Sequence, residues 1–298
     1  MAAADIPAPR QSGFTTTTVV PLYWAAYGPP SASPLLVLHG GPGAHHDYLL
    51  PQMLELARDR EVIFYDQRGG GRSKSEDREP ITAQTHVADL AAIVQEMALR
   101  PLSLVGYSFG GLIALLYAIE HAPGDRGVPS RLVLIDPAPI SRQYRIRFES
   151  EFARRQSGAE VSAMREDLEG SGLRESDSEA YRQRRFELSV AGYFADPARA
   201  TDLTPFRVIG RIQQSVWNSL DAYDLTGQLG AIEAPTLVLH GRMDPIPLES
   251  SRDVADALPN GRLVIIEDAG HVPYVEKPRA LFDAIRDFLG ETEPEMTR

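Results

Sequence analysis

Short hydrophobic runs recur along the 298-residue chain, with more polar, helix-like stretches between them. The short runs predict buried strands and the intervening stretches predict helices. Strands that alternate with helices predict a mostly parallel sheet that is covered on both faces. The eight predicted strands are Thr16–Val20, Leu22–Tyr27, Leu35–His39, Val62–Asp66, Leu102–Gly106, Leu132–Asp136, Thr236–His240 and Leu263–Glu267.

Helices are expected on most of the connections between these strands. The first two strands follow each other without a helix, so the sheet is expected to begin with an antiparallel pair. The predicted helices are about Asp47–Arg58, Thr82–Leu99, Phe109–His121, Leu248–Ala257 and Pro278–Leu289.

The alternation stops between about Pro139 and Ala234, where no continuous strand-like run occurs and Arg, Glu and Gln are frequent. Stretches such as Tyr144–Arg155 and Ala180–Val190 look helical. We therefore predict a helical cap, residues 139–231, inserted between strands six and seven of a discontinuous catalytic domain, residues 14–138 and 232–290. Such a cap would lie over the carboxyl ends of the strands, where open α/β sheets bind ligands. The alternative is a helical layer with no part in binding.

Composition narrows the classes of function. The formal net charge of −11 disfavours nucleic acids and anionic membranes as partners, because both bind clustered positive charge. The absence of cysteine excludes disulfides, thiolate nucleophiles and Cys-ligated zinc. The N-terminal segment Met1–Phe14 has no apolar run of signal-peptide length, and no run in the sequence approaches the ~18 apolar residues of a membrane span. We expect a cytoplasmic protein that acts on small molecules, as a monomer or a small homo-oligomer.

A candidate nucleophile, Ser108, lies in the sequence Gly106-Tyr107-Ser108-Phe109-Gly110. This GxSxG pattern follows a predicted strand and precedes a predicted helix, which is the context of a nucleophile elbow. The flanking glycines are expected because Cβ atoms there would collide with neighbouring backbone.

A serine hydroxyl needs a base to take its proton and an acid to orient that base. Asp244 and His271 follow the last two predicted strands, in the chain order that this arrangement requires. Asp136 is an alternative acid because it ends the sixth predicted strand.

The developing oxyanion needs two backbone donors. One is expected to be the amide of Phe109, directly after the serine. The second is assigned to Gly41, in the glycine-rich loop His39-Gly40-Gly41-Pro42-Gly43 that follows the third predicted strand.

Two further patterns suggest other chemistry only weakly. His45 and His46, paired with Asp47, are residue types that bind metals, but no further ligand is evident in the sequence. The segment Asp66–Ser73 is rich in glycine and arginine but lacks the spacing of a phosphate-binding loop, so Asp66 and Arg68 are expected to hold loops in place. We expect no cofactor and no metal.

With these residues in place, the chain resembles the α/β-hydrolase superfamily and, within it, the prolyl aminopeptidase (proline iminopeptidase) family. His39–Gly43 looks like the family's oxyanion-loop signature, and Asp66–Ser73 looks like its companion motif. Gly241–Asp244 and Gly270-His271 look like its acid and base segments. The resemblance implies release of an N-terminal residue, often proline, from small peptides by a Ser-His-Asp triad.

The resemblance also implies that acidic cap residues bind the substrate's free amine. Two departures matter: the elbow differs from the Gly-Gly-Ser-Trp-Gly that is frequent in the family, and Pro245 stands where some relatives have a glutamate. The cap residues that we consider as amine anchors are Glu149, Glu151, Glu187 and Asp221. Gly40, Tyr107 and Trp217 are further candidates for substrate contact.

Three functions remain open at this stage. The first is an aminopeptidase for proline or small N-terminal residues. The second is an esterase, lactonase or amidase that acts on a small metabolite. The third is a non-catalytic binding protein with the same fold.

Overall fold

A single eight-stranded sheet forms the centre of the molecule. The computed structural model describes residues 6–75, 80–121 and 127–290. The strands run in the order β1-β2-β4-β3-β5-β6-β7-β8; β2 is antiparallel to β1 and β4, and the other neighbours are parallel. Their bounds are β1 Gln11–Phe14, β2 Tyr23–Tyr27, β3 Leu35–Leu38, β4 Val62–Tyr65, β5 Leu102–Tyr107, β6 Pro129–Ile135, β7 Thr236–Gly241 and β8 Gly261–Ile266. The mostly parallel sheet and its antiparallel start are as predicted.

The first strand was predicted in the wrong place. The β-branched run Thr16–Val20 lies outside the strands, and Gln11–Phe14 forms β1 instead. The carboxylate of Glu96 accepts hydrogen bonds from the backbone amides of Thr16 and Thr17, at 2.8 Å each. These amides therefore bond to a side chain rather than to a strand, and tertiary contact overrides the β propensity of threonine.

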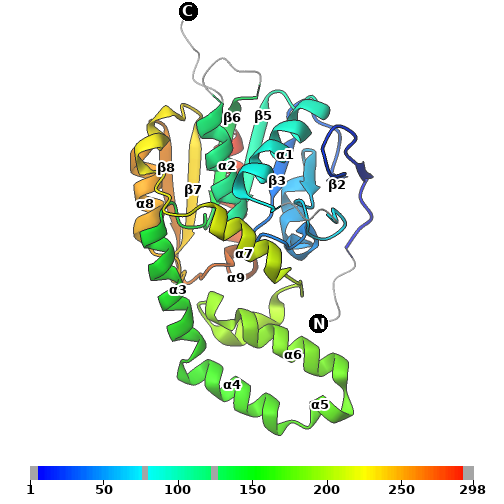
Figure 1. Cartoon of the computed structure of the whole chain (residues 1–298), viewed down its shortest axis with the longest axis vertical. Helices are drawn as coiled ribbons and strands as arrows, with labels where there is room; N and C mark the ends of the chain where they lie inside the picture. The colour runs from blue at the N-terminus through cyan, green and yellow to red at the C-terminus, as the bar shows by residue number, and fades with distance from the viewer. Residues whose placement is uncertain (1–5, 76–79, 122–126, 291–298) are drawn as a thin grey trace, which may run out of the picture.

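Helices cover both faces of the sheet (Figure 1). Helices α1 (Ala83–Glu96), α2 (Phe109–Glu120) and α8 (Leu248–Ala257) pack in one hydrophobic cluster, and α10 (Pro278–Gly290) packs in the other. Strand residues alternate between the clusters: Leu36 and Leu38 face one, and Leu35 and Val37 face the other. Parallel strands buried on both faces explain why the strand sequences are continuously apolar.

The helix predicted at Asp47–Arg58 is instead two short 3₁₀ helices, η1 (His46–Leu49) and η2 (Gln52–Ala57). Pro51 separates them. Proline lacks a backbone N–H and disfavours helical geometry in the residue before it, so a continuous helix cannot pass through this position.

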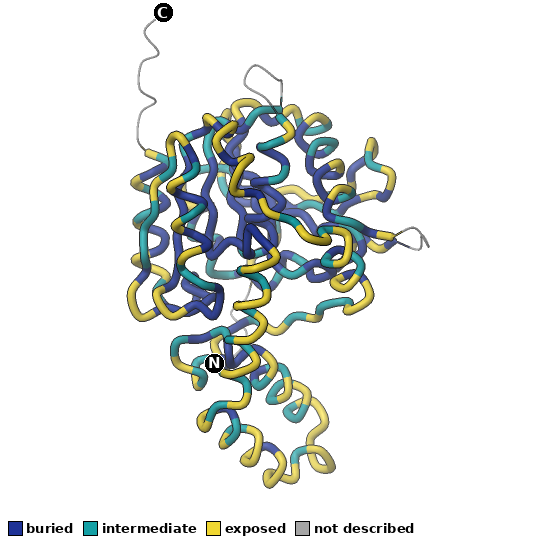
Figure 2. The backbone as a smooth tube through the Cα atoms, turned by 60° about the vertical axis from the view of Figure 1, so that its left-hand side comes forward, coloured by how far each residue is buried: buried dark blue, intermediate teal, exposed yellow. Residues whose placement is uncertain are grey.

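A run of helices joins β6 to β7 and extends beyond the carboxyl ends of the parallel strands (Figure 1). These elements are α3 (Arg142–Gln156), α4 (Ala159–Gly170), α5 (Leu173–Ser176), α6 (Ser178–Val190), η3 (Ala191–Tyr193), η4 (Pro197–Asp202), α7 (Gly210–Ser219) and η5 (Thr226–Ala231). Figure 2 shows that exposed residues dominate the part furthest from the sheet, whereas the sheet itself is buried. We refer to residues 142–231 as the helical insertion. The position between strands six and seven is as predicted.

In the described ranges, no helix combines the length and the apolar character that crossing a membrane requires.

Candidate active site

Ser108 lies at a strained turn between β5 and α2. Its backbone has φ 52° and ψ −118°, a combination that side-chain-bearing residues rarely adopt. The turn leaves no space on either side: a Cβ on Gly106 would lie 2.6 Å from the Cα of Gly111, and a Cβ on Gly110 would lie 2.2 Å from the carbonyl oxygen of Leu38. The glycines that flank the serine are therefore required by sterics, as predicted.

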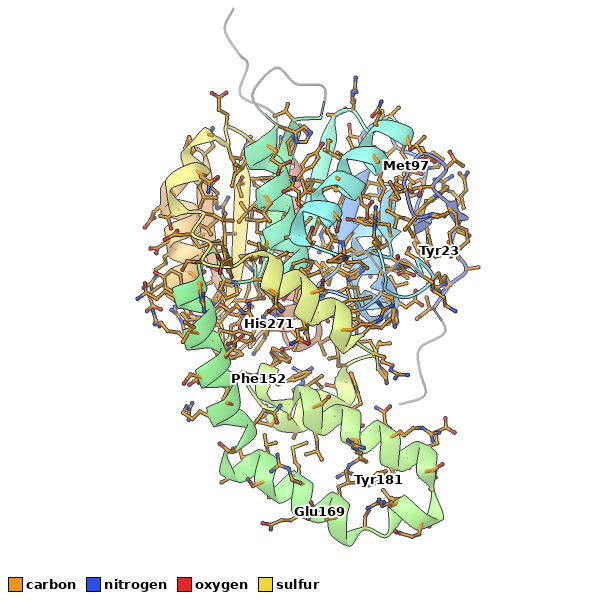
Figure 3. All side chains as sticks on the ribbon, in the orientation of Figure 1. Tyr23, Met97, Phe152, Glu169, Tyr181 and His271 are labelled. Atoms are coloured by element: carbon orange, nitrogen blue, oxygen red, sulfur yellow. The ribbon has the colours of Figure 1, made fainter. Side chains whose placement is uncertain are left out.

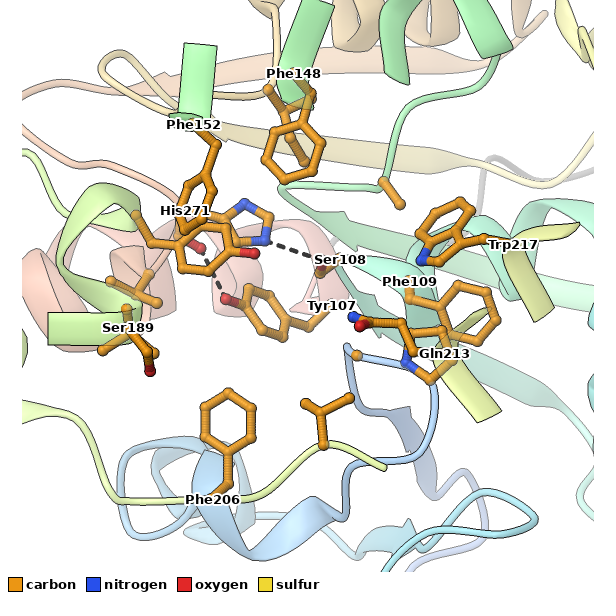
Figure 4. A pocket seen from close by; sticks show the side chains of 18 of the residues that line it. Tyr107, Ser108, Phe109, Phe148, Phe152, Ser189, Phe206, Gln213, Trp217 and His271 are labelled. Atoms are coloured by element: carbon orange, nitrogen blue, oxygen red, sulfur yellow. Dashed lines mark hydrogen bonds between the residues drawn. The ribbon is translucent and has the colours of Figure 1, made fainter. Parts of the chain in front are cut away.

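His271 links Ser108 to Asp244. Nε2 of His271 lies 2.9 Å from Oγ of Ser108 (Figure 4), and Nδ1 of His271 lies 2.8 Å from Oδ2 of Asp244. The other oxygen of Asp244 accepts the backbone amide of Ile246 at 2.7 Å. Both oxygens of the carboxylate thus face N–H donors, which fixes the imidazole with Nε2 toward the serine hydroxyl. The three residues that the sequence singled out meet at one point.

Burial sets the charge of the imidazole. It lowers the pKa of His271 to about 4, and it raises the pKa of Asp244. At neutral pH His271 is therefore uncharged, and Nε2 carries the lone pair that can accept the proton of Ser108. This is the protonation state that a general base needs before reaction.

The alternative acid, Asp136, lies behind this chain of hydrogen bonds. It is fully buried, and its Oδ1 accepts the amide of Gly241 at 2.7 Å. Nδ1 of His271 bonds to Asp244 and not to Asp136. Asp136 nevertheless lies close by, since one ligand atom each of Asp136, Asp244 and His271 fall within 4.8 Å of one another.

Gly41 and Phe109, the predicted oxyanion donors, both line the cavity beside Ser108. Phe109 is the first residue of α2, so its amide has no acceptor within the helix. Gly41 has φ +66°, which favours glycine. Both amides belong to segments that the fold holds beside the nucleophile.

The loop that carries Gly41 is tied to the loop after β4. Nε2 of His39 accepts the amide of Gln67 at 3.1 Å, and the Gln67 side chain donates to the carbonyl of His39 at 2.7 Å. Asp66 accepts hydrogen bonds from the backbone and ring of His46, and Arg68 pairs with Asp89 of α1. The structural role expected for Asp66 and Arg68 agrees with these contacts.

The pair His45-His46, which raised the possibility of a metal, serves the same loops. Nδ1 of His46 bonds to Asp66 at 2.7 Å, and its Nε2 lies 3.2 Å from Asp47. Both ring nitrogens of His46 therefore face carboxylates within the protein. This arrangement favours a structural role for the histidine.

A cavity of about 690 Å³ lies between the strand ends and the helical insertion and opens beside Ser108. Figure 4 shows aromatic rings around the Ser108–His271 pair, and Figure 3 places Phe152 and His271 at the junction of insertion and sheet. In the described part of the chain, the charged residues that line it are Arg145 and Glu149. The aromatic lining residues of the insertion are Phe148, Phe152, Phe186, Tyr193, Phe206 and Trp217.

Three of the predicted substrate-contact residues line this cavity: Tyr107, Trp217 and Glu149. Tyr107 also donates its hydroxyl to the carbonyl of His271 at 2.9 Å. Glu149 is held by Nε of Arg145 at 2.8 Å, and the Arg145 guanidinium lies 4.4 Å from the centre of the Trp217 ring. An ion pair stacked on an indole therefore forms part of the wall.

The other predicted contacts do not line this cavity. Glu187 is buried within the insertion and accepts a hydrogen bond from Gln183 at 3.0 Å. The side chain of Asp221 is 89% exposed. Glu151 pairs with Arg154 and Arg155 away from the cavity. Gly40 lies beneath Ser108, where its amide donates to the Tyr48 hydroxyl at 2.8 Å. Where these side chains lie depends on which face of each helix packs inward and on the partners that each side chain bonds to. The sequence shows neither.

The loop that carries Gly270 and His271, which we call the base loop, is held by a side chain that was not anticipated from the sequence. The carboxylate of Glu276 accepts the amides of Gly270, at 2.6 Å, and of Ala195 in the insertion, at 2.9 Å. The amide of His271 donates to the carbonyl of Tyr193 at 2.7 Å. A glutamate shortly after the histidine was the available signal, but its two backbone partners lie far apart in the chain.

Comparison with known proteins places the chain in a family. The sequence profile described as alpha/beta hydrolase fold matches residues 33–278. The chain belongs to this α/β-hydrolase family. Members of the family are hydrolases, and the resemblance predicted from the motifs is confirmed.

Among curated relatives, this α/β hydrolase is similar to proline iminopeptidases. It is 27% identical over 272 residues to the enzyme of Lactobacillus delbrueckii subsp. lactis, covering 86% of this chain and 90% of the relative. It is also 27% identical over 276 residues to that of Clostridioides difficile (strain 630), covering 87% and 90%.

Solved structures confirm the fold. Proline iminopeptidase from Mycobacterium smegmatis superposes with a TM-score of 0.69 at 22% identity, covering 94% of this chain and 98% of the other. Est816, described as an N-acyl homoserine lactone degrading enzyme, superposes with a TM-score of 0.63 at 22% identity, covering 93% and 100%. At these identities the likeness establishes the α/β-hydrolase fold and leaves the substrate open.

Proposed function

We propose that this protein is a serine hydrolase in which Ser108, His271 and Asp244 form the catalytic triad. The observation that carries the proposal is the unbroken hydrogen-bonded chain from Oγ of Ser108 through His271 to Asp244, placed at the wall of a cavity. A structural serine needs neither the strained turn nor a buried neutral base beside its hydroxyl.

The geometry supports the following reaction. Ser108 Oγ attacks the carbonyl carbon of an amide or ester while Nε2 of His271 takes its proton. The oxyanion accepts hydrogen bonds from the amides of Phe109 and Gly41. His271 then protonates the leaving group, whose bond to the carbonyl carbon breaks, and an acyl-enzyme remains. Water, activated by the same histidine, releases the acid and regenerates the serine.

Asp244 acts through the imidazole. Its carboxylate accepts Nδ1–H, which fixes the tautomer, and it stabilises the positive charge that His271 acquires during attack. Because the side chain is fully buried, this charge interaction is screened less than it would be in water.

The similarity to proline iminopeptidases supports an aminopeptidase that releases proline or another small N-terminal residue from short peptides. Glu149 is the carboxylate of the cavity wall that can face a substrate ammonium. A substrate amine at this position competes with Arg145, which already holds one oxygen of Glu149.

The second candidate is an esterase, lactonase or amidase for a small, largely apolar acyl group. The observation that favours it is the same ion pair: because Arg145 neutralises Glu149, the aromatic wall offers an ammonium no unpaired carboxylate among the described lining residues. Moving an ammonium from water into such a wall costs desolvation that a neutral group does not incur.

A matched substrate panel separates the candidates. Prolyl and alanyl arylamides, their N-acetylated forms and simple aryl esters would be compared by kcat/KM. An aminopeptidase cleaves free amines and loses activity when the amine is blocked. The second candidate predicts strong turnover of the aryl esters and no cleavage of the arylamides, whether their amine is free or blocked.

The triad itself is tested by Ser108→Ala. We expect hydrolysis to fall by at least about a thousandfold with the fold intact. We also expect an alkyl fluorophosphonate to label the wild type and not the variant. Unchanged turnover in the variant, or no labelling of the folded wild type, would overturn the proposal and favour a non-catalytic binding protein.

A further inference from the structure

Asp136 is a buried carboxyl group that the proposed reaction does not use. It follows β6, its side chain is fully buried, and its backbone has φ +42°. Oδ1 accepts the amide of Gly241 at 2.7 Å. Oδ2 is buried as well and has no hydrogen-bond partner among the described residues. A buried polar atom without a partner is costly, so the surroundings of Oδ2 require an explanation.

The neighbour of Asp136 is the Asp244 carboxylate: one oxygen of each group lies within 4.8 Å of the other. Two buried carboxylates this close together are not both ionised, so one proton is shared between them. On Asp244 both oxygens already accept N–H donors, from Ile246 and His271. Oδ2 of Asp136 is the oxygen that accepts none, and it has room for the proton.

We propose that Asp136 is a positioning residue that keeps its proton at neutral pH and donates it in a hydrogen bond to the Asp244 carboxylate. The inference rests on the proposed triad and extends it by one residue, so that the chain runs from Ser108 through His271 and Asp244 to Asp136. Oδ2 of Asp136 then has a hydrogen-bond partner. The Asp244 carboxylate accepts a third hydrogen bond beside those from Ile246 and His271.

In the ranges that the structure describes, the groups around Asp136 do not supply a counter-ion that would remove the need for this proton. Nδ1 of His240 lies 3.7 Å from Oδ1 of Asp136. Nε2 of His240 lies 3.2 Å from the carbonyl of Ile246, and Nδ1 lies 2.9 Å from the Ser251 hydroxyl. A neutral ring satisfies both contacts, with Nε2–H donating and Nδ1 accepting. Burial also lowers the pKa of His240 to about 4, so this ring carries no charge at neutral pH.

The other titratable groups that interact with the two carboxyl groups are His271, Tyr107, Tyr193, Tyr274, Glu276 and Arg155. His271 is neutral before reaction, the tyrosines stay protonated because burial raises their pKa, and Arg155 pairs with Glu151. Glu276 adds further negative charge to the surroundings of Asp244. Burial, and then the charge of Asp244, raise the pKa of Asp136 well above its ordinary value, in agreement with the hydrogen-bond count.

The contact has a mechanistic consequence. A hydrogen bond from a neutral acid to a carboxylate is a strong, charge-assisted one, and it keeps the negative charge on Asp244, next to the imidazole. Loss of the donor leaves Asp244 free to turn or to take up a proton, and either change weakens its hold on Nδ1–H of His271.

Infrared spectroscopy tests the proton directly. The wild type minus Asp136→Asn difference spectrum at neutral pH is expected to show the carbonyl stretch of one protonated carboxylic acid. Other buried acids are common to both proteins and cancel. A difference spectrum with only carboxylate bands would overturn the proposal, because Asp136 would then be ionised.

Kinetics test the positioning role. Asparagine keeps a donor at this position and tolerates positive φ, whereas Asp136→Gly removes the donor without adding backbone strain. We expect Asp136→Asn to retain at least about ten times the kcat of Asp136→Gly, with similar KM in both. Equal losses in both variants would show that the charge, and not the donor, matters, which contradicts the proposal.

The two proposals fail separately. The infrared measurement needs no substrate, so its result stands whether or not Ser108 is the nucleophile. A carboxylic acid band combined with unchanged turnover in Ser108→Ala would reject the triad and keep the protonated pair. The absence of the band combined with an inactive Ser108→Ala would do the opposite.

Discussion

The backbone amide of His271 donates to the carbonyl oxygen of Tyr193 at 2.7 Å, and the two rings lie 5.1 Å apart. The residue proposed as the base is therefore held partly by the helical insertion. A Cβ on Gly270 would lie 2.2 Å from the same carbonyl, so the two segments approach as closely as backbone allows. The insertion contributes to the geometry of the base as well as to the cavity.

Glu276→Gln is expected to loosen this junction. The carboxylate accepts one amide from the base loop, at Gly270, and one from the insertion, at Ala195. Glutamine replaces one acceptor oxygen by a donor, so one buried amide loses its partner at a cost of about 1–3 kcal/mol. We expect a lower free energy of unfolding in urea and a fall in kcat of about tenfold.

The matched control for this prediction is Glu169→Gln, an exposed glutamate at the far end of the insertion (Figure 3). It removes the same charge without breaking the junction, so stability and kcat should stay near wild type. Equal behaviour of the two variants would contradict a structural role for Glu276.

The pH dependence of kcat/KM is expected to reflect the buried imidazole. Burial lowers the pKa of His271 from 6.5 to about 4. Only the neutral ring can take the serine proton, so activity falls as the pH drops through the pKa of the free enzyme. The acidic limb should therefore have its midpoint well below 6.5, measured with a substrate that does not titrate in this range. A midpoint at or above 6.5 would be inconsistent with the neutral, buried base.

Gly110→Ala is expected to damage the elbow. The added Cβ would lie 2.2 Å from the backbone oxygen of Leu38, and backbone cannot move aside as a flexible side chain can. We expect a loss of at least about 2 kcal/mol in unfolding free energy and a large loss of activity. Gly170→Ala is the control, because no atom lies within 4 Å of its new Cβ. If both variants unfold alike, the steric account of the elbow is wrong.

His86 makes stability depend on pH. The ring is fully buried in α1, neither nitrogen has a hydrogen-bond partner among the described residues, and burial lowers its pKa to about 3. The unfolded chain takes up this proton near pH 6.5, and the folded chain does so only near pH 3. Stability is therefore lost as the pH falls below 6.5, by about 2 kcal/mol at pH 5.

The test of this linkage is His86→Leu, which removes the titrating ring. Its advantage over wild type in unfolding free energy should be about 2 kcal/mol larger at pH 5 than at pH 7. Urea unfolding at the two pH values measures the difference. An advantage that does not change with pH would exclude His86 as the titrating group.

The sequence predicted those parts of the site that depend on local chain geometry. The elbow around Ser108 requires glycines at fixed positions, and Asp244 and His271 follow strands that end at one edge of the sheet. The parallel topology then brings them together. The strand misplaced at Thr16–Val20 shows the limit, because a contact to Glu96, about eighty residues away, decides that segment.

The cavity wall could not be predicted in the same way. Phe148, Phe152 and Tyr193 face the cavity only because α3 and η3 pack across the strand ends, and Glu187 turns to Gln183 instead. Which face of an inserted helix points inward depends on the packing of the whole insertion. Sequence periodicity does not identify the inward face of a helix whose charged residues are spread around it, as they are in α3.

The residues proposed to react and the residues that line the substrate cavity come largely from different parts of the chain. The proposed triad comes from strand ends, whereas most of the aromatic wall comes from one contiguous stretch between β6 and β7. We therefore predict that exchange of this stretch with a relative's changes which substrates bind and leaves Ser108, His271 and Asp244 in place. The residues around Tyr193 and Ala195 contact the loop that carries His271. A chimera must therefore preserve them to keep His271 in place.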